Sequence, residues 1–573
     1  MTGRARHLAA AVTGLLLGAL AIGPGLAPGF VLSYDMVFVP DPAFTPMTFG
    51  LTGTVPRHVP SDAFAVALGT VLPGDVAQKP ILLAIFVLAC TSAASVVPSK
   101  RLVPRLAAGV LYAWNPFVAE RLLLGQWALL LGYAALPWAL AAAARAGERG
   151  GGRRVVRALL PAAVGGFAAL AVSGLAALIV ALFAGRRAAG RVVAAAALLS
   201  LPWLVPGLLR PGGVPGDDSA VGLFAARADT PFGTLGSLLL LGGVWNGETV
   251  PDGYGAPLTA VLWLVAVVGA LVAYGLWTRD EPWRAPVRGG LAAAAAAGFA
   301  VAALGAVAEP VLAGLIGLWP GFAVLRDGQQ FVAPLAVVIA VGAGVAADRA
   351  AEARLPMVPI GLAVVPVLLL PTLAWGAAGE LRAVQYPDDW ARARQIIEGD
   401  PAEGDVLLLP WAQYRSYEWN RGRRVLDPLP RYLDRRVIVN DAVTVGRTTV
   451  APEDPRAVRL AETLSSDDSS GSPGAATLRD AGVRYVVVDA EIDRFRPPGT
   501  ERVLRGPHLA VYRVDGPVAR VDERVPAAPA VAAWALTGAG VFWSIVCPGT
   551  SLSIPLLGSI RARSPRRDRR TSP

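Results

Sequence analysis

Two carboxylates that follow the first long apolar run are the clearest candidates for acid–base chemistry. Asp35 comes shortly after the run at 8–29, and Asp41 follows it with five residues between them. A carboxylate in this place lies at a membrane–water interface, where it can meet both a lipid-linked phosphate and a hydroxyl group that arrives from outside. Because a general base must reach the proton that it removes, this position suits a reaction on a lipid-carried donor. We predict Asp35 as the base and Asp41 as the second candidate.

A second group of polar and aromatic side chains interrupts the apolar sequence near position 115. Its members are Trp114, Asn115, Glu120, Arg121, Gln126 and Trp127. A charge at the bilayer centre costs roughly 2.5–3.5 kcal/mol on insertion scales, so such groups usually lie at an interface or face a cavity. The Asn-Pro break also predicts irregular backbone, which at this depth must be buried in protein or line a cavity.

Three other segments between apolar runs add side chains of the same kinds. They hold Arg57, His58 and Asp62 in 30–79, Trp245 in 210–255, and Arg326, Asp327 and Gln330 in 319–330. Histidine is the weakest of these candidates for chemistry, and tryptophan is normally enriched at membrane interfaces.

The composition predicts that membrane-spanning helices carry these residues. The chain has 573 residues, of which 54% are hydrophobic and 16% are charged, whereas a soluble domain carries about 25% charged residues. The apolar residues form runs of roughly 15–25, the length that crosses the hydrocarbon core. The runs lie at 8–29, 80–97, 104–118, 127–144, 156–172, 173–185, 191–209, 256–277, 289–308, 329–347, 356–376 and 527–547. We predict an all-α polytopic bundle of about 12 transmembrane helices.

The distribution of arginine favours one orientation of these helices. With the N-terminus inside, the inner loops are 100–105, 145–157, 186–191, 279–288, 348–354 and the tail 548–573. All are rich in arginine, as cytoplasmic loops are. This agreement requires two passes within 156–185, with a break near Gly165, Gly166, Ser173 or Gly174. We therefore predict a multi-pass plasma-membrane protein with both termini in the cytoplasm and an uncleaved first helix.

Residues 377–526 have the pattern of a separate extracytoplasmic α/β domain. Strands are predicted at 405–410, 436–440, 484–489 and 508–514, and helices at 388–398 and 454–465. The β-branched run that follows Gly482 is typical of a buried strand. Trp411, Tyr414, Trp419 and Asn420 form an aromatic-polar cluster for which packing is the favoured role and glycan binding the alternative. The domains are thus 1–376 in the membrane, with outer loops 30–79, 210–255 and 309–328, then 377–526 outside, the last helix 527–547, and a basic tail.

A membrane protein with many helices and an acidic residue in its first outer loop resembles the GT-C superfamily of glycosyltransferases. The motifs also resemble the membrane half of actinobacterial arabinofuranosyltransferases, which use polyprenyl-phosphate arabinose. The matching residues are Trp114-Asn115-Pro116, Gly125-Gln126-Trp127 and Pro137-Trp138. The resemblance covers residues 1–380. One departure is that many GT-C enzymes carry adjacent acidic residues in the first loop, where Asp35 and Asp41 stand apart.

The resemblance implies an inverting transfer of a sugar from a polyprenyl-phosphate donor to a cell-wall glycan or lipid acceptor. In that reaction Asp35, or Asp41, deprotonates the acceptor hydroxyl. Guanidinium groups hold the lipid phosphate through bidentate hydrogen bonds, and the candidates are Arg57, Arg121 and Arg326. The candidates for sugar or acceptor binding are Trp114, Asn115, Glu120, Gln126, Trp127, Trp245, Asp327 and Gln330. No cofactor is implied, and a divalent cation is left open.

Other function classes receive less support. The net charge of +10 comes without a nucleic-acid recognition module, and the two cysteines, Cys90 and Cys547, lie in apolar runs. No phosphate-cradling loop, HExxH or Cys-x-x-Cys motif occurs. A flippase for a lipid-linked envelope precursor is the main alternative, although the helices hold few charges. A non-catalytic envelope assembly protein is the other.

Overall fold

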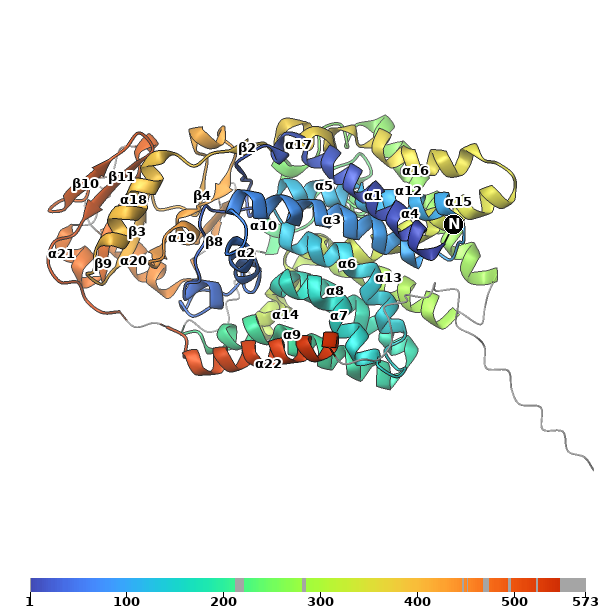
Figure 1. Ribbon diagram of the computed structural model, residues 1–573, viewed down its shortest axis with the longest axis horizontal. Coiled ribbons are helices and arrows are strands. Elements are labelled where there is room, and N and C mark those ends of the chain that lie inside the picture. The colour runs from blue at the N-terminus through green and yellow to red at the C-terminus, as the bar shows by residue number, and fades with distance from the viewer. Residues whose placement is uncertain are drawn as a thin grey trace, which may run out of the picture.

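The computed structural model describes residues 2–211, 221–280, 285–445, 448–450, 452–466, 474–492, 496–521 and 524–546. A bundle of roughly parallel and antiparallel helices forms one part of the molecule, and a smaller α/β domain covers one end of it (Figure 1). Cys547 and the basic tail lie outside the described residues.

Nine helices of the described chain are long and apolar enough to cross a membrane, or ten if one bent pair counts as a single span. The nine are α1 (Gly3–Ile22), α3 (Gly74–Val96), α6 (Trp127–Ala144), α8 (Gly166–Ala184), α9 (Arg186–Leu209), α12 (Pro257–Asp280), α13 (Ala285–Val307), α15 (Ala333–Glu352) and α22 (Ala527–Val546). The bent pair is α16 (Met357–Leu369) with the segment Pro371–Gly379, at 64°. The multi-pass membrane bundle is therefore confirmed, whereas the predicted number of about 12 is not.

Two helix breaks explain most of the difference in number. The apolar run 104–118 forms α4 (Leu102–Ala113) and α5 (Pro116–Leu123), because the Asn115 side chain accepts a hydrogen bond from the Val118 amide at 3.1 Å and starts a new helix. The run 156–185 forms α7 (Gly151–Val164) and α8, which meet at Gly165 and Gly166. Gly166 has φ +72°. Two helices are thus present, with the break earlier than residue 172.

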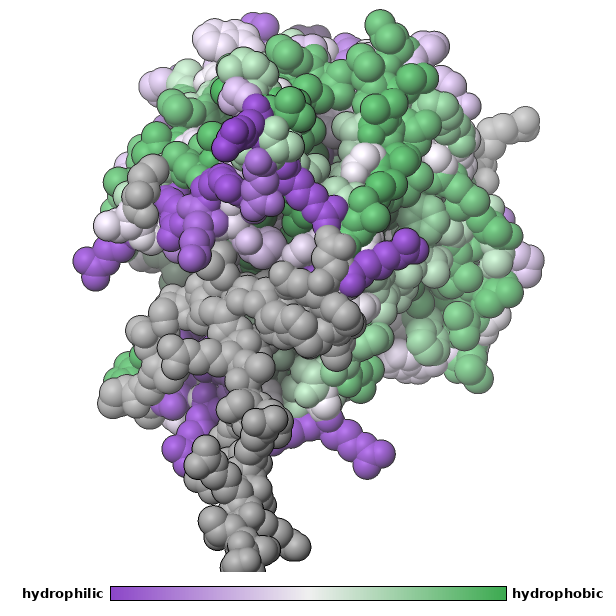
Figure 2. Space-filling model, turned by 90° about the vertical axis from the view of Figure 1, so that its right-hand side faces the viewer, coloured by the Kyte–Doolittle hydropathy of each residue, from purple (hydrophilic) through white to green (hydrophobic). Residues whose placement is uncertain are grey.

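Large apolar side chains cover the outside of the bundle. Leu16, Leu258 and Leu368 lie on three different helices and are 66–73% exposed. The end of the bundle that faces away from the α/β domain gathers hydrophilic residues, with apolar residues on the flank beside them (Figure 2). This distribution fits a protein whose flank lies in lipid.

The arginine-rich loops meet one another at that end of the bundle. The Arg6 guanidinium donates to the Lys100 carbonyl oxygen at 2.6 Å, and Arg101 pairs with Asp348 at 2.8 Å. Arg191 likewise donates to the Glu148 carbonyl oxygen. Loops that the positive-inside pattern assigns to one side of the membrane therefore lie together in the fold.

The α/β domain is built on a five-stranded sheet with the order β10-β11-β9-β3-β6. Its strands are β3 (Asp405–Leu409), β6 (Val437–Ile438), β9 (Val483–Asp489), β10 (Glu501–Arg505) and β11 (Leu509–Arg513). β3 pairs in parallel with β6 and β9, and β11 is antiparallel to β9. The helices are α18 (Asp388–Gly399), α19 (Leu429–Tyr432), α20 (Pro455–Ser466) and α21 (Ala475–Asp480). The four predicted strands and two predicted helices are present, and β10 is additional.

One short sheet and one bridge from Tyr34 to Val425, next to a second short sheet, join the domain to the loop that follows α1. β1 (Phe30–Val31) pairs with β2 (Ala383–Val384), and β4 (Tyr414–Arg415) pairs with β5 (Val425–Leu426). The Leu426 amide donates to the Tyr34 carbonyl oxygen at 2.8 Å. A further hairpin joins β7 (Val443–Val445) to β8 (Thr448–Val450). The loop that follows α1 is consequently part of the hydrogen bonding of the α/β domain.

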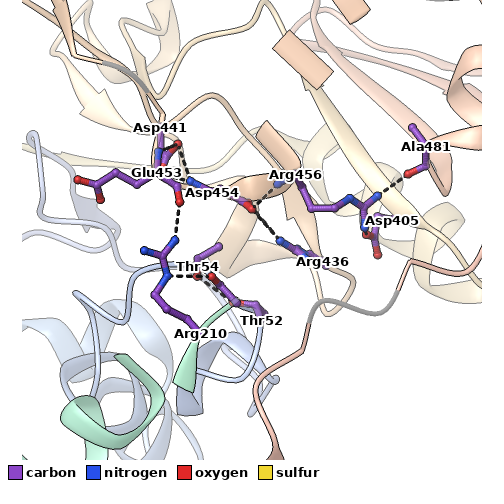
Figure 3. A network of polar contacts seen from close by, with 11 residues as sticks. Thr52, Thr54, Arg210, Asp405, Arg436, Asp441, Glu453, Asp454, Arg456 and Ala481 are labelled. Carbon is purple, nitrogen blue, oxygen red and sulfur yellow. Dashed lines mark hydrogen bonds and ion pairs between the residues drawn. The ribbon is translucent and has the colours of Figure 1, made fainter. Parts of the chain in front are cut away.

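A second joint lies where α9 ends. Arg210 donates to the Gly53 carbonyl oxygen at 3.2 Å and to the Glu453 carbonyl oxygen. Asp454, the next residue, pairs with Arg436 at 3.0 Å (Figure 3). This network fixes the α/β domain to the helix bundle at a place distinct from β1 and β2.

The chain leaves the membrane through a left-handed turn. In α17 (Ala374–Gly379), residues 375–378 have φ between 48° and 70°. A non-glycine residue in this conformation costs roughly 1–2 kcal/mol. The turn packs on the end of α1, where a Cβ atom at Gly23 would lie 2.8 Å from the Trp375 Cα atom. This turn directs the chain from α16 to β2.

The remaining helices are short and lie in the loops. They are α2 (Ser61–Gly69), α10 (Val221–Phe224), α11 (Gly233–Leu239) and α14 (Glu309–Leu318). Among the 3₁₀ helices, η4 spans Gly247–Thr249, η6 spans Pro320–Leu325 and η7 spans Gly328–Val332.

Candidate active site

Asp35 lies in a tight turn at the junction of the bundle and the α/β domain. The Met36 amide donates to the Ser33 carbonyl oxygen at 2.8 Å, and Tyr34 between them has φ 44°. The Asp35 amide donates to the carbonyl oxygen of Leu124 at the end of α5, at 3.2 Å. The Tyr34 amide donates to the Arg424 carbonyl oxygen at 2.8 Å. Both parts of the molecule therefore hold the backbone of Asp35.

Gly125 allows this close approach. It has φ +76°, and a Cβ atom there would lie 2.0 Å from the Ser33 carbonyl oxygen and 2.3 Å from the Met36 amide nitrogen. Both atoms are backbone, so the clash cannot be relieved by a side-chain rotation. The predicted Gly-Gln-Trp motif thus begins with a glycine that the Asp35 turn requires.

The Asp35 carboxylate is half-buried and hydrogen-bonded from the α/β domain. The Tyr414 hydroxyl donates to Asp35 Oδ1 at 2.7 Å. Burial raises the pKa of Asp35, and the nearby Asp327 raises it further, whereas Tyr414, Arg431 and Gln126 lower it. The net direction is upward, which makes this carboxylate a stronger base than an ordinary aspartate.

Asp327 is the second carboxylate of this region. Gln329 and Gln330 in η7 donate to its two oxygens. Burial raises the pKa of Asp327, while Arg121 and the Gln126 amide lower it. Since Gln126 acts on both carboxylates and Asp327 acts on Asp35, the predicted residues of α5, the first outer loop and the 319–330 segment converge here.

A buried charged group lies behind these carboxylates. Glu120 and Arg121 in α5 are 0% and 1% exposed. Within the described residues, neither Glu120 oxygen has a hydrogen-bond partner, nor do Nε and Nη1 of Arg121. Burial raises the pKa of Asp229, and the Gly243 amide and the nearby Arg121 lower it. Arg121 thus keeps two guanidinium donors for an anion that enters the site.

The other two predicted arginines have different surroundings. Arg326 lies with its guanidinium carbon 4.9 Å from the centre of the Phe224 ring, next to Asp327. Arg57 pairs with Glu453 at 2.5 Å, at the joint with the α/β domain. Its carboxylate partner makes it a brace between the two parts.

Asp41 is not brought to the Asp35 turn. Its side chain is exposed, its φ is 49°, and its carbonyl oxygen accepts a hydrogen bond from Arg394 in α18 at 3.1 Å. The geometry therefore favours Asp35 of the two predicted bases.

The predicted sugar-binding tryptophans and Asn115 make their contacts inside the protein. Trp114 is fully buried, and its Nε1 donates to the Leu370 carbonyl oxygen at 3.0 Å. Trp127 is 5% exposed and packs against the Phe38 ring at 5.2 Å. Asn115 is buried as the cap of α5. Trp114 and Trp127 thus have no face available for a sugar, and Asn115 positions α5. Trp245, half-buried, contacts the Phe224 ring edge-on at 5.0 Å.

His58 and Asp62 lie near Arg431, an arginine that the sequence analysis did not single out. Arg431 pairs with Asp62 at 3.0 Å. Burial lowers the pKa of His58 well below its usual range, and Arg431 and Arg57 lower it further, so this imidazole is neutral. Because Arg431 also acts on Asp35, it links the two carboxylates electrostatically.

Sequence reasoning did not place Tyr414, Arg431 or Asp229 at this site. Tyr414 had been noted only as part of an aromatic-polar cluster. Among the described residues, no group of three or more His, Cys, Asp and Glu side chains is arranged to hold a metal ion.

No protein-family model matches the chain, and no curated protein matches its sequence with statistical significance. A solved structure superposes on 91% of this chain with a TM-score of 0.51 and 17% sequence identity: arabinofuranosyltransferase AftD from Mycobacteria. The chain therefore has an AftD-like fold. It spans 40% of the length of AftD. The expected architecture, a membrane helix bundle with an α/β domain, is thereby confirmed, and the likeness is one of fold alone.

Proposed function

We propose that this protein is a membrane glycosyltransferase that acts at the outer face of the plasma membrane. The observation that carries the proposal is the Asp35 carboxylate, whose pKa burial raises and whose Oδ1 accepts from Tyr414 at 2.7 Å. We propose that the other oxygen of this carboxylate receives the proton of the acceptor hydroxyl. The GT-C fold supports the same class of reaction by analogy.

The proposed donor is a polyprenyl-phosphate sugar, and the acceptor is a cell-wall glycan or lipid. Asp35 takes the proton of the acceptor hydroxyl as its oxygen attacks the anomeric carbon. The bond between that carbon and the phosphate oxygen breaks, and the lipid phosphate leaves with the electron pair. Attack opposite the leaving group inverts the anomeric configuration.

Arg121 is the proposed partner of the leaving phosphate. It is 1% exposed, and two of its guanidinium nitrogens have no partner among the described residues. Donors that are in place before the reaction stabilise the charge that develops on the leaving group without reorganisation. Gln126 and Asp327 act on Asp35, and Gln330 donates to Asp327, so these side chains are the proposed neighbours of the transferred sugar.

Arabinofuranose is the proposed sugar, because AftD is an arabinofuranosyltransferase. The proposed orientation places residues 377–526 outside the cell and both termini in the cytoplasm. The arginine-rich loops that meet at the other end of the bundle support that orientation.

The test is an in vitro assay of the purified full chain with a panel of radiolabelled polyprenyl-phospho-sugars. We expect transfer from one donor, and a loss of about 100- to 10,000-fold in Asp35→Asn. Asp41→Asn is the matched control and should transfer normally, because its side chain is exposed and away from the Asp35 turn. Undiminished transfer by folded Asp35→Asn protein would refute the assignment of the base.

A further inference from the structure

A polar cavity lies beside Tyr34, the residue that precedes the proposed base. It has a volume of about 290 Å³, close to the lower limit of roughly 300 Å³ for small-molecule sites. Its walls come from the first outer loop, the second outer loop, the segment after α17, and the turn between β4 and β5. We call it the arginine pocket, after Arg382, Arg421, Arg423 and Arg424.

The charges of the arginine pocket do not balance. Its four arginines face only two carboxylates, Glu248 and Glu380. Arg423 pairs with Glu380 at 2.7 Å, and Arg424 pairs with Glu248 at 3.4 Å. Both carboxylates are thus already used by arginines of the same wall.

Arg382 and Arg421 supply the excess positive charge. Arg382 Nε donates to the Gly379 carbonyl oxygen at 2.9 Å, which holds the side chain beside the pocket. Arg421 has φ 57° at the tip of the turn before β5. Within the part of the chain that the structure describes, neither guanidinium pairs with a carboxylate at salt-bridge distance. Two guanidinium groups from separate segments therefore face one cavity with donors to spare.

The pocket is joined to the Asp35 turn through Tyr34. The Tyr34 hydroxyl donates to Glu248, and the Tyr34 ring lies 6.2 Å from the ring of Tyr414. Arg423 Nε donates to Ser33 Oγ at 3.0 Å, on the other flank of the turn. A group bound in the pocket would therefore lie within one side chain's width of the proposed transfer site.

We propose that the arginine pocket binds a phosphate group. Two planar guanidinium forks from different segments suit an anion that can accept from both at once, and phosphate offers three acceptor oxygens. Glu380 follows directly after the last inner span, so the phosphate can belong either to a phospholipid headgroup or to a soluble phosphorylated molecule. The site is separate from the phosphate that Arg121 is proposed to hold and does not require the transfer reaction.

The experiment uses the full chain in nanodiscs of zwitterionic phosphatidylcholine, with inorganic phosphate as the probe in a calorimetric titration. We expect saturable binding. Arg382→Gln and Arg421→Gln should each raise the Kd for phosphate about tenfold or more, the usual effect of losing one charge-assisted hydrogen bond. Arg421→Lys should retain part of the affinity. Arg502→Gln, an exposed arginine of β10, is the matched control and should bind as the wild type does.

A second set of nanodiscs that contain anionic phosphatidylglycerol identifies the source of the phosphate. If the headgroup occupies the pocket, the apparent Kd for phosphate rises in these discs, and if a soluble molecule does, it stays the same. Asp35→Asn should bind phosphate normally, so a failure of the transfer proposal would not affect this result. Absence of saturable binding, or equal affinity in the Arg382→Gln/Arg421→Gln double variant, would overturn the proposal.

Discussion

The hydrogen bond from Tyr414 to Asp35 predicts how the pH dependence of transfer responds to one missing oxygen atom. Tyr414→Phe removes the hydroxyl that donates to Asp35 Oδ1 at 2.7 Å but keeps the ring that packs near Tyr34. The buried anion then loses a donor, whereas the protonated carboxyl loses little. Because the Tyr414 hydroxyl lowers the pKa of Asp35, its removal raises that pKa further.

The size of the effect follows from the type of bond. A hydrogen bond to a charged group contributes about 1.5–3 kcal/mol, and one pKa unit corresponds to about 1.36 kcal/mol. The pKa of Asp35 should therefore rise by about one to two units in Tyr414→Phe. A general base works in its ionised form, so the acid limb of kcat/KM should move to higher pH by the same amount.

The assay is kcat/KM for the polyprenyl-phospho-sugar, measured across pH for the wild type and the variant. Tyr512→Phe is the matched control, because Tyr512 is buried in β11 of the same domain and its profile should not move. An acid limb that stays in place, or that moves to lower pH, would show that Tyr414 does not stabilise the ionised base.

Three further predictions test the surroundings of the base. Gly125→Ala should reduce transfer by about 100-fold, since a displacement of about 1 Å at reacting groups has that effect. Gly247→Ala is the control and should not change transfer, because the space around its Cβ position is open. Equal activity in both variants would contradict the predicted clash at Gly125. Arg121→Lys should raise the KM for the donor about tenfold by losing the bidentate fork, and an unchanged KM would exclude Arg121 as the phosphate ligand. Asp427→Ala should lower the free energy of unfolding by about 3–5 kcal/mol, because it strands the buried guanidinium of Arg415, its partner at 3.0 Å; a thermal melt that coincides with the wild type would disprove this.

Much of the fold could be predicted because its signals are local. The apolar runs and arginine-rich loops reflect the thickness of a bilayer and the bias of its two sides. The run Val483–Asp489 forms β9 because β-branched residues suit a strand buried on both faces. The predicted count of about 12 spans is not confirmed among the described residues, because hydropathy does not register a helix cap. Asn115 divides one run into two helices that are each too short to cross.

The residues of the candidate site also differ in whether a local sequence signal could predict them. Asp35, Gln126, Asp327 and Gln330 were predicted from their place beside apolar runs, and the fold brings them together. Tyr414 could not be predicted, because it is 379 residues away from Asp35 in the sequence. No single-sequence signal specifies the pairing of a short outer strand with a distant loop. The burial of Trp114 could not be predicted, because burial and interfacial exposure give the same local pattern.

The pairing of β1 with β2, and of Tyr34 with Leu426, sets an order of events during biosynthesis. Translation delivers the first outer loop early, yet the strands that complete it emerge only after all the inner spans have been made. Nascent chains fold from the N-terminus as they appear. The backbone groups of this loop therefore lack their hydrogen-bond partners until β2 and Leu426 have been synthesised. A ribosome that stops before residue 414 would release an inserted helix bundle whose Asp35 turn lacks the hydrogen bonds from Leu426 and Tyr414.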